Sequence, residues 1–139
     1  MTDTTDTSSQ KPLIVIVDDE AHILHVVSLK LRNAGYEVIS AQNGEEGYEA
    51  VVQHHPLLFI TDYQMPVMSG LEMCTKLKKE PSTANIRAIM LTARGFSIPP
   101  DALEKTNIQM VLSKPFSPRE ILAKVQELVE SQSEKAKES

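Results

Sequence analysis

The chain has a single cysteine, Cys74, among its 139 residues. One thiol cannot form a disulfide within the chain, so the sequence excludes a disulfide-stabilised domain and favours a reducing compartment. The sequence also lacks any run of ~18 apolar residues, the length that a membrane-spanning helix needs. The stretch from Met1 to Asp6 has neither a basic region nor an apolar segment, which argues against a secretory signal. We therefore expect a cytoplasmic protein with no membrane contact.

Clusters of positive charge are also missing. The formal net charge is −5, and no stretch collects enough Lys and Arg to suggest a nucleic-acid footprint. Lys76, Lys78 and Lys79 lie close together, but one solvated helix face explains them. We therefore expect no direct nucleic-acid binding by this chain. Its length fits one domain with one core of ordinary size.

Apolar runs alternate with segments of helical periodicity along most of the chain. The apolar, partly β-branched runs predict five strands, at residues 13–17, 36–40, 57–62, 86–91 and 108–112. About five helices are predicted between and after them, and this alternation is typical of a parallel sheet covered on both faces, a doubly wound α/β fold. We expect one domain at residues 12–130, between a disordered N-terminal tail at 1–11 and a polar, frayed tail at 131–139.

Three of the predicted helices carry a similar start signal, a capping side chain three residues before a glutamate. The pairs are Asn43 with Glu46, Ser69 with Glu72, and Ser117 with Glu120. The fourth helix differs because Pro99 and Pro100 prevent helix formation before them. It is therefore predicted to begin near Pro100 and to be short.

Polar side chains follow four of the five predicted strands at the point where each strand ends. They are Asp18, Asp19, Asp62, Thr92 and Lys114. In a parallel sheet these positions lie along one edge. A single aspartate after a strand is as easily a helix cap or a turn residue, but the whole set indicates a functional site. Three crowded carboxylates raise a pKa or recruit a cation, and a site with few carboxylates and room for water suits Mg²⁺.

These groups suit phosphoryl transfer. Asp62 is already ionised at neutral pH and can attack a phosphoryl group as a carboxylate nucleophile. Mg²⁺ and Lys114 would neutralise the negative charge of the phosphoryl oxygens, and Thr92 offers a hydroxyl donor to one of them. The residues therefore predict a self-consistent phosphoryl-acceptor site centred on Asp62.

Four short motifs stand at these strand ends, in the following order: Asp18-Asp19, Asp62-Tyr63-Gln64-Met65-Pro66-Val67-Met68-Ser69-Gly70, Thr92-Ala93 and Lys114-Pro115-Phe116. As a set they resemble the receiver domain of two-component response regulators, and the resemblance extends over residues 13–129. It implies a flavodoxin-like fold with five parallel strands in the order 2-1-3-4-5. It also implies that a histidine kinase or a histidine phosphotransfer protein is the partner that phosphorylates Asp62.

The resemblance assigns further roles to single residues. Mg²⁺ would be held by Asp19, Asp62 and the Gln64 backbone carbonyl directly, and by Asp18 through water. Lys114 would pair with Asp62, and a cis peptide bond between Lys114 and Pro115 would aim the lysine side chain. Thr92 would move toward the phosphoryl group. The side chains of Gln64 and Arg94 would flank that group and influence how fast it hydrolyses.

The chain departs from the family at the position three residues before Lys114. Many receivers carry an aromatic ring there that turns inward when the threonine moves, but this chain has Val111. Valine cannot swing a large ring between two environments, so Thr92 is expected to act through backbone movement. Phe96 is a candidate substitute for the missing ring because it lies close to Thr92 in the sequence.

Two other functions remain open at this point. One is a binding scaffold with a receiver fold that no longer accepts phosphate, although the full set of five site residues argues against it. The other is a phosphohydrolase with an aspartate nucleophile, similar to the haloacid dehalogenase family. Those enzymes carry a second aspartate two residues after the nucleophile, where this chain has Gln64. We therefore expect a protein that catalyses only its own phosphorylation and dephosphorylation. Its downstream protein target cannot be read from the sequence.

Overall fold

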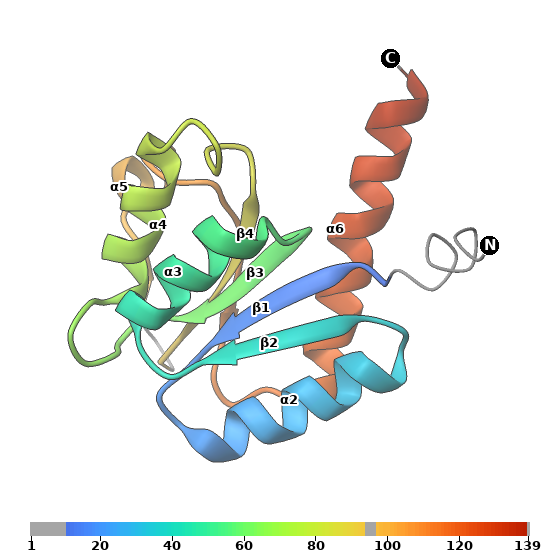
Figure 1. Ribbon diagram of the computed structural model, residues 1–139, viewed down its shortest axis with the longest axis horizontal. Coiled ribbons are helices and arrows are strands. Elements are labelled where there is room, and N and C mark those ends of the chain that lie inside the picture. The colour runs from blue at the N-terminus through green and yellow to red at the C-terminus, as the bar shows by residue number, and fades with distance from the viewer. Residues whose placement is uncertain (1–10, 94–96, 139) are drawn as a thin grey trace.

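Five parallel strands form one sheet in the order β2-β1-β3-β4-β5 (Figure 1). The computed structural model describes the backbone of residues 11–93 and 97–138, and the side chains of these residues up to 131. The strands are β1 Leu13–Val17, β2 Glu37–Ala41, β3 Leu58–Asp62, β4 Arg87–Thr92 and β5 Ile108–Ser113. Each lies within one residue of its predicted bounds, and the predicted fold class and strand order are confirmed.

Helices cover both faces of the sheet. The helices α2 (Ala21–Asn33) and α6 (Pro118–Glu138) pack on one face. The helices α3 (Gly44–His54), α4 (Gly70–Lys79) and α5 (Pro100–Glu104) pack on the other (Figure 1). Side chains alternate along β1, so Ile14 and Ile16 join the first core and Val15 and Val17 the second. An apolar core therefore packs on each face of the sheet and holds the strands in place, so that their carboxyl ends lie together at one end of the sheet.

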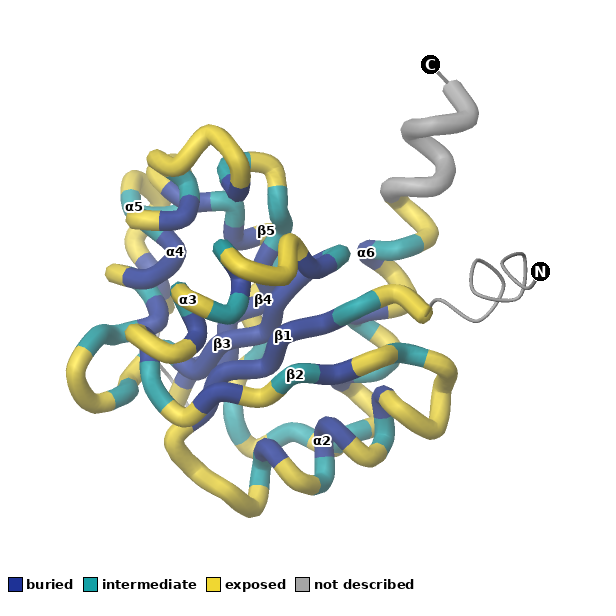
Figure 2. Tube along the Cα trace, in the orientation of Figure 1, coloured by how far each residue is buried: buried dark blue, intermediate teal, exposed yellow. Residues whose placement is uncertain are grey.

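The inner strands are more deeply buried than the edge strand β2 (Figure 2). All five residues of β3 are buried, as expected for a continuous apolar run covered on both faces. In β2, Glu37 and Ser40 are exposed, which agrees with its more polar sequence and its place at the edge. Cys74 packs inside the second core, and burial raises the pKa of its thiol, so it is a packing residue.

The predicted helix starts are present. The Asn43 side chain accepts a hydrogen bond from the Glu46 N–H, and reciprocal capping boxes join Ser69 with Glu72 and Ser117 with Glu120. The helix α5 begins at Pro100 and has 5 residues, so the prediction of a short fourth helix is confirmed. Among the described residues, no helix combines the length and the apolar character required to cross a membrane.

The chain end differs from our expectation. We predicted a frayed polar tail from residue 131, but α6 continues as helix to Glu138 and extends past the sheet (Figure 1). The reason is local, because the sequence has no Gly or Pro after Pro118 and residues 134–138 are good helix formers. The expected N-terminal tail falls almost wholly on residues 1–10, which lie outside the described residues.

Candidate phosphoryl-acceptor site

The predicted site residues converge at the carboxyl edge of the sheet. Asp18 directly follows β1, Asp62 is the last residue of β3, and Thr92 is the last residue of β4. The Lys114 N–H, just beyond β5, donates a hydrogen bond of 2.8 Å to the Thr92 carbonyl oxygen. The parallel topology therefore brings together side chains that are far apart along the chain, as the sequence predicted.

Three carboxylates form a compact cluster at this edge. One oxygen from each of Asp18, Asp19 and Asp62 lies within 4.8 Å of the others. Asp18 has 0% and Asp62 6% of its surface exposed, whereas Asp19 is exposed. Two of the three negative charges are therefore held away from water, where charge is costly unless it is compensated.

The pKa of both buried carboxyls reflects this cost. The pKa of Asp18 is raised to about 6. Burial is the largest cause, the hydrogen bond from the Glu20 N–H partly offsets it, and repulsion from Asp62 adds to it. Burial also raises the pKa of Asp62, although the Lys114 ammonium partly offsets that effect. The ionised carboxylates of the cluster are therefore electrostatically unfavourable, and a bound cation would stabilise them.

Lys114 supplies one such positive charge. Its Nζ lies 3.3 Å from Asp62 Oδ1 and 3.9 Å from Glu20 Oε1. Burial lowers the pKa of Lys114, but the attraction of Asp62 and Asp18 outweighs burial and the pKa is raised. The Lys114–Pro115 peptide bond is cis. Lys114 is therefore a charged ammonium beside the proposed nucleophile.

Two buried oxygens at the site have no hydrogen-bond partner among the described residues. They are Asp18 Oδ2 and Thr92 Oγ1. Buried polar atoms are nearly always satisfied, so each unsatisfied atom needs an explanation. A hard divalent cation bound by the three carboxylates would satisfy Asp18, because oxygen-only ligand sets suit such ions. The residues present therefore fit a cation of this class.

A hollow of about 210 Å³ opens above the cluster. Its lining consists of Asp19, Glu20, Asp62, Tyr63, Gln64, Ala93 and Lys114. The volume is large enough for a small anion and several waters, and Gln64 is one of the residues that line it. Arg94 and Phe96 lie outside the described residues, so the structure does not place the other predicted tuning residue or the candidate substitute ring.

The loop after β3 is anchored close to Asp62. The Gly70 N–H donates to the Tyr63 carbonyl oxygen at 2.8 Å, and a Cβ at Gly70 would collide with the Asp62 backbone carbonyl. Only glycine permits this approach of α4 to the end of β3. The first residue of α4 therefore packs directly against the backbone of Asp62, the proposed nucleophile.

Val111 lies on β5 opposite Met90 of β4, and 42% of its surface is exposed. It therefore offers no large side chain that could turn between an outer and an inner position.

The residue that sequence reasoning missed is Glu20. It contacts Lys114 and lines the hollow, and its position directly after Asp19 was the available signal.

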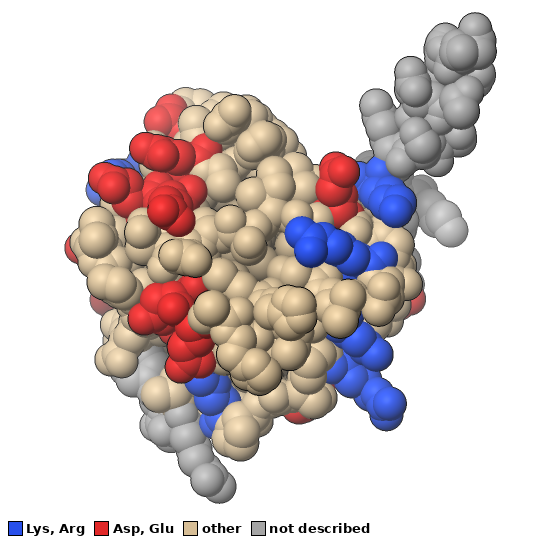
Figure 3. Space-filling view, turned by 60° about the horizontal axis from the view of Figure 1, so that its bottom comes forward, with Lys and Arg blue, Asp and Glu red and all other residues tan. Residues whose placement is uncertain are grey.

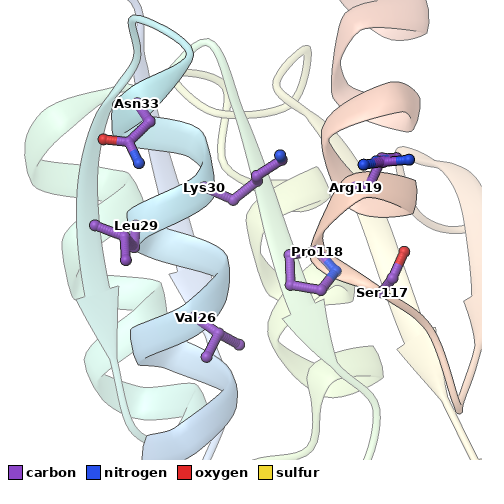
Figure 4. A pocket seen from close by; sticks show the side chains of 7 residues that line it. All are labelled: Val26, Leu29, Lys30, Asn33, Ser117, Pro118 and Arg119. Atoms are coloured by element: carbon purple, nitrogen blue, oxygen red, sulfur yellow. The ribbon is translucent and has the colours of Figure 1, made fainter.

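A larger hollow of about 500 Å³ lies between α2 and the start of α6, lined by Val26, Leu29, Lys30, Asn33, Ser117, Pro118 and Arg119 (Figure 4). It contains no carboxylate, so it is separate from the acidic cluster.

Comparison with known proteins connects this geometry to a family. The family model for the response regulator receiver domain matches residues 14–126. The chain is 37% identical over 112 residues to the phosphate regulon transcriptional regulatory protein PhoB of Pseudomonas aeruginosa, a match that covers 81% of this chain and 49% of that protein. It is 36% identical over 118 residues to the DNA-binding dual master transcriptional regulator RpaA of Synechocystis, covering 85% of this chain and 49% of that protein. The chain thus spans about half the length of the curated relatives it matches.

Solved structures agree. The CheY-like response regulator receiver domain protein from Methanospirillum hungatei has a TM-score of 0.80 and 27% identity, covering 91% of this chain and 99% of that one. A response regulator from Chloroflexus aurantiacus, described as putative, has a TM-score of 0.77 and 31% identity, covering 85% of this chain and 97% of that one.

Proposed function

The chain belongs to the response regulator receiver domain family, and from this premise we propose that it accepts a phosphoryl group on Asp62 in a two-component phosphorelay. The donor would be a phosphohistidine of a histidine kinase or of a phosphotransfer protein. The observation that carries the proposal is the position of Lys114 Nζ, 3.3 Å from Asp62 Oδ1, beside a cluster of three carboxylates.

The chemistry requires little from the protein beyond positioning and charge. An Asp62 carboxylate oxygen forms a bond to phosphorus while the bond from phosphorus to the donor nitrogen breaks, and the imidazole leaves with the electron pair. Lys114 offsets the charge on Asp62 before transfer and on the phosphoryl oxygens after it. No general base is needed, because the nucleophile carries no proton when it is ionised.

Mg²⁺ is the proposed cofactor. Asp18, Asp19, Asp62 and the Gln64 backbone carbonyl would hold it, and when bound it would supply positive charge to the phosphoryl oxygens. The unsatisfied Asp18 Oδ2 and the oxygen-only cluster support this assignment. The raised pKa of Asp18 supports it too, because that carboxylate is poorly compensated by the protein alone.

Phosphorylation would change a protein-interaction surface through Thr92. Its hydroxyl is buried and has no hydrogen-bond partner within the described residues, so it can donate to a phosphoryl oxygen without breaking an existing bond. A phosphoryl group adds roughly −1.5 to −2 of charge, enough to bias the loop after β4. Because Val111 cannot act as an aromatic switch, the backbone around Thr92 would carry the signal to the downstream target.

The remaining aspects of the function follow from the same site. The protein would act in the cytoplasm and would catalyse only its own phosphorylation and dephosphorylation. The formal net charge of −5 supports contact with a protein target rather than direct nucleic-acid binding by this chain. On the face drawn in Figure 3, Lys and Arg side chains form several groups along one side, and Asp and Glu side chains gather mainly on the other.

Labelling with a small phosphodonor tests the proposal. The protein, incubated with acetyl phosphate and Mg²⁺, should gain one phosphoryl group in intact-mass measurements, and an Asp62→Asn variant should gain none. A chelator should abolish labelling of the parent. Equal labelling of parent and variant would contradict the assignment of Asp62. No labelling of either would favour the non-phosphorylated scaffold, and continuous release of phosphate from a stable ester would favour the phosphohydrolase.

A further inference from the structure

Glu20 stands at the opening of the hollow that holds Asp62. Its carboxylate Oε1 lies 3.9 Å from Lys114 Nζ, which also makes the shorter contact of 3.3 Å to Asp62 Oδ1. The Glu20 side chain is 58% exposed, whereas that of Asp62 is 8% exposed. The Lys114 ammonium is therefore shared between a buried carboxylate, the proposed nucleophile, and a carboxylate at the surface.

This placement of the Glu20 side chain is not explained by helix capping. Glu20 is the N-cap residue of α2, yet its side chain makes no capping hydrogen bond within that described helix. Its backbone N–H instead donates to Asp18 Oδ1 at 2.9 Å. The main chain of Glu20 thus holds one carboxylate of the cluster, and its side chain reaches the cation that serves another.

We propose that Glu20 is a positioning and specificity-determining residue of the phosphoryl-acceptor site. Its charge holds the Lys114 ammonium toward the opening and adds negative potential where a donor must approach. It would favour binding of a divalent cation and disfavour small phosphodonors in proportion to their negative charge. This inference rests on the proposed function of Asp62 and assigns a selectivity to the same site.

Two small phosphodonors that differ in net charge can test this selectivity. Acetyl phosphate is a doubly charged anion at neutral pH, whereas phosphoramidate has one negative charge less because its nitrogen is protonated. In both reactions an Asp62 oxygen forms the new bond to phosphorus. The bond to acetate oxygen or to ammonia nitrogen breaks, and the leaving group keeps the electron pair. Neither transfer needs a further reactant. Because the leaving groups also differ, the effect of donor charge is measured as the change in each donor's rate between the parent and the variant.

The experiment uses Glu20→Gln, which removes the charge and keeps the shape. At saturating Mg²⁺, phosphorylation by acetyl phosphate should become about threefold faster, a modest factor because exposed charges interact weakly near water. Phosphorylation by phosphoramidate should change less, because this donor carries one negative charge less. Glu20→Asp keeps the charge and should restore the parent ratio of the two rates. Glu37→Gln removes an equal charge at the first residue of β2, at the amino ends of the strands and away from the site, and should leave the ratio of the two rates unchanged.

Calorimetric titration with Mg²⁺ alone gives a second readout that needs no phosphorylation. Glu20→Gln should weaken Mg²⁺ binding by about threefold, and Glu37→Gln should not change it. Circular dichroism confirms that each variant is folded. An equal rise with both donors, or an unchanged Mg²⁺ affinity in Glu20→Gln, would overturn the role of Glu20. If the parent accepts phosphate from neither donor, the proposed function fails, while the Mg²⁺ titration still decides whether the Glu20 charge acts on the site.

Discussion

Lys114 Nζ lies 3.3 Å from Asp62 Oδ1, although the two residues belong to different strand ends and are separated by one intervening strand. The carboxylate is 8% exposed and the lysine side chain 27% exposed, so the pair is partly shielded from water and salt. One ammonium cannot compensate three clustered carboxylates. The site in its free state is therefore electrostatically unfavourable, and this has consequences for stability.

Asp18 should destabilise the protein at neutral pH in the absence of divalent cations. Its pKa is raised in the folded state from an ordinary 3.8 to about 6, so the cost of its charge is absent below about pH 4 and complete above about pH 6. Asp18→Asn should therefore raise the free energy of unfolding at pH 7 by about 2 kcal/mol and change it little at about pH 3.5. Urea denaturation at both pH values measures this.

The exposed Asp101 provides the control for that experiment, because Asp101→Asn removes a carboxylate from the start of α5 instead of from the cluster. Added Mg²⁺ should stabilise the parent more than Asp18→Asn, since a ligand that binds the folded state raises its stability. Equal stability of parent and Asp18→Asn at neutral pH would show that the carboxylate is already compensated.

Thr92 and Thr61 are both fully buried but should respond in opposite ways to loss of the hydroxyl. Thr92 Oγ1 has no partner among the described residues, whereas Thr61 Oγ1 donates to the Asp62 carbonyl oxygen at 3.0 Å. Thr92→Val should therefore raise the free energy of unfolding by about 1 kcal/mol, and Thr61→Val should lower it by a similar amount. Thermal denaturation of both variants would be informative, and a loss of stability in Thr92→Val would indicate a hidden partner.

Gly70 and Gly35 should differ in their tolerance of a methyl group. A Cβ at Gly70 would collide with the Asp62 backbone, so Gly70→Ala should cost at least about 2 kcal/mol and slow phosphorylation by displacing Asp62. Gly35 has a φ of +102° with open space around it, so Gly35→Ala should cost only about 1 kcal/mol, through backbone strain. Denaturation curves and labelling rates test both, and normal labelling of Gly70→Ala would contradict the close-packing argument.

Val67 is held in an unfavourable conformation in the loop between β3 and α4. Its φ is 74° and it is 78% exposed, while the Met68 N–H donates to the Pro66 carbonyl oxygen across it at 2.8 Å. A β-branched residue at positive φ is strained. Val67→Gly should therefore stabilise the protein by about 1 kcal/mol, since no apolar packing is lost. His55→Gly, at a milder φ of 48°, should give a smaller gain in the same denaturation assay.

Gln64 and Arg94 should influence phosphoryl lifetime without being required for phosphorylation. Gln64 lines the hollow above Asp62 and can affect how water approaches the phosphoryl group. Gln64→Ala and Arg94→Ala should each accept phosphate from acetyl phosphate yet release it at a rate different from that of the parent. Dephosphorylation followed after donor removal measures the rates, and identical rates in all three proteins would refute the assignment.

Local signals in the sequence determined most of the architecture. Apolar runs placed the five strands within one residue, and the serine and asparagine caps placed three helix starts, because both signals depend on neighbours along the chain. The five polar residues at strand ends could be assigned to one edge for the same reason, since parallel strands end together. The extent of α6 to Glu138 is also a local property, because no Gly or Pro interrupts the sequence after Pro118.

The tertiary structure alone decided how these residues act on one another. The burial of Asp18, the unsatisfied Thr92 hydroxyl and the sharing of Lys114 between Asp62 and Glu20 depend on how strands and loops pack at the sheet edge. Charge interactions change strongly with distance and exposure, and neither can be read from spacing along the chain. The sequence therefore identified the chemical groups of the site, and packing determined their charge balance and their access to water.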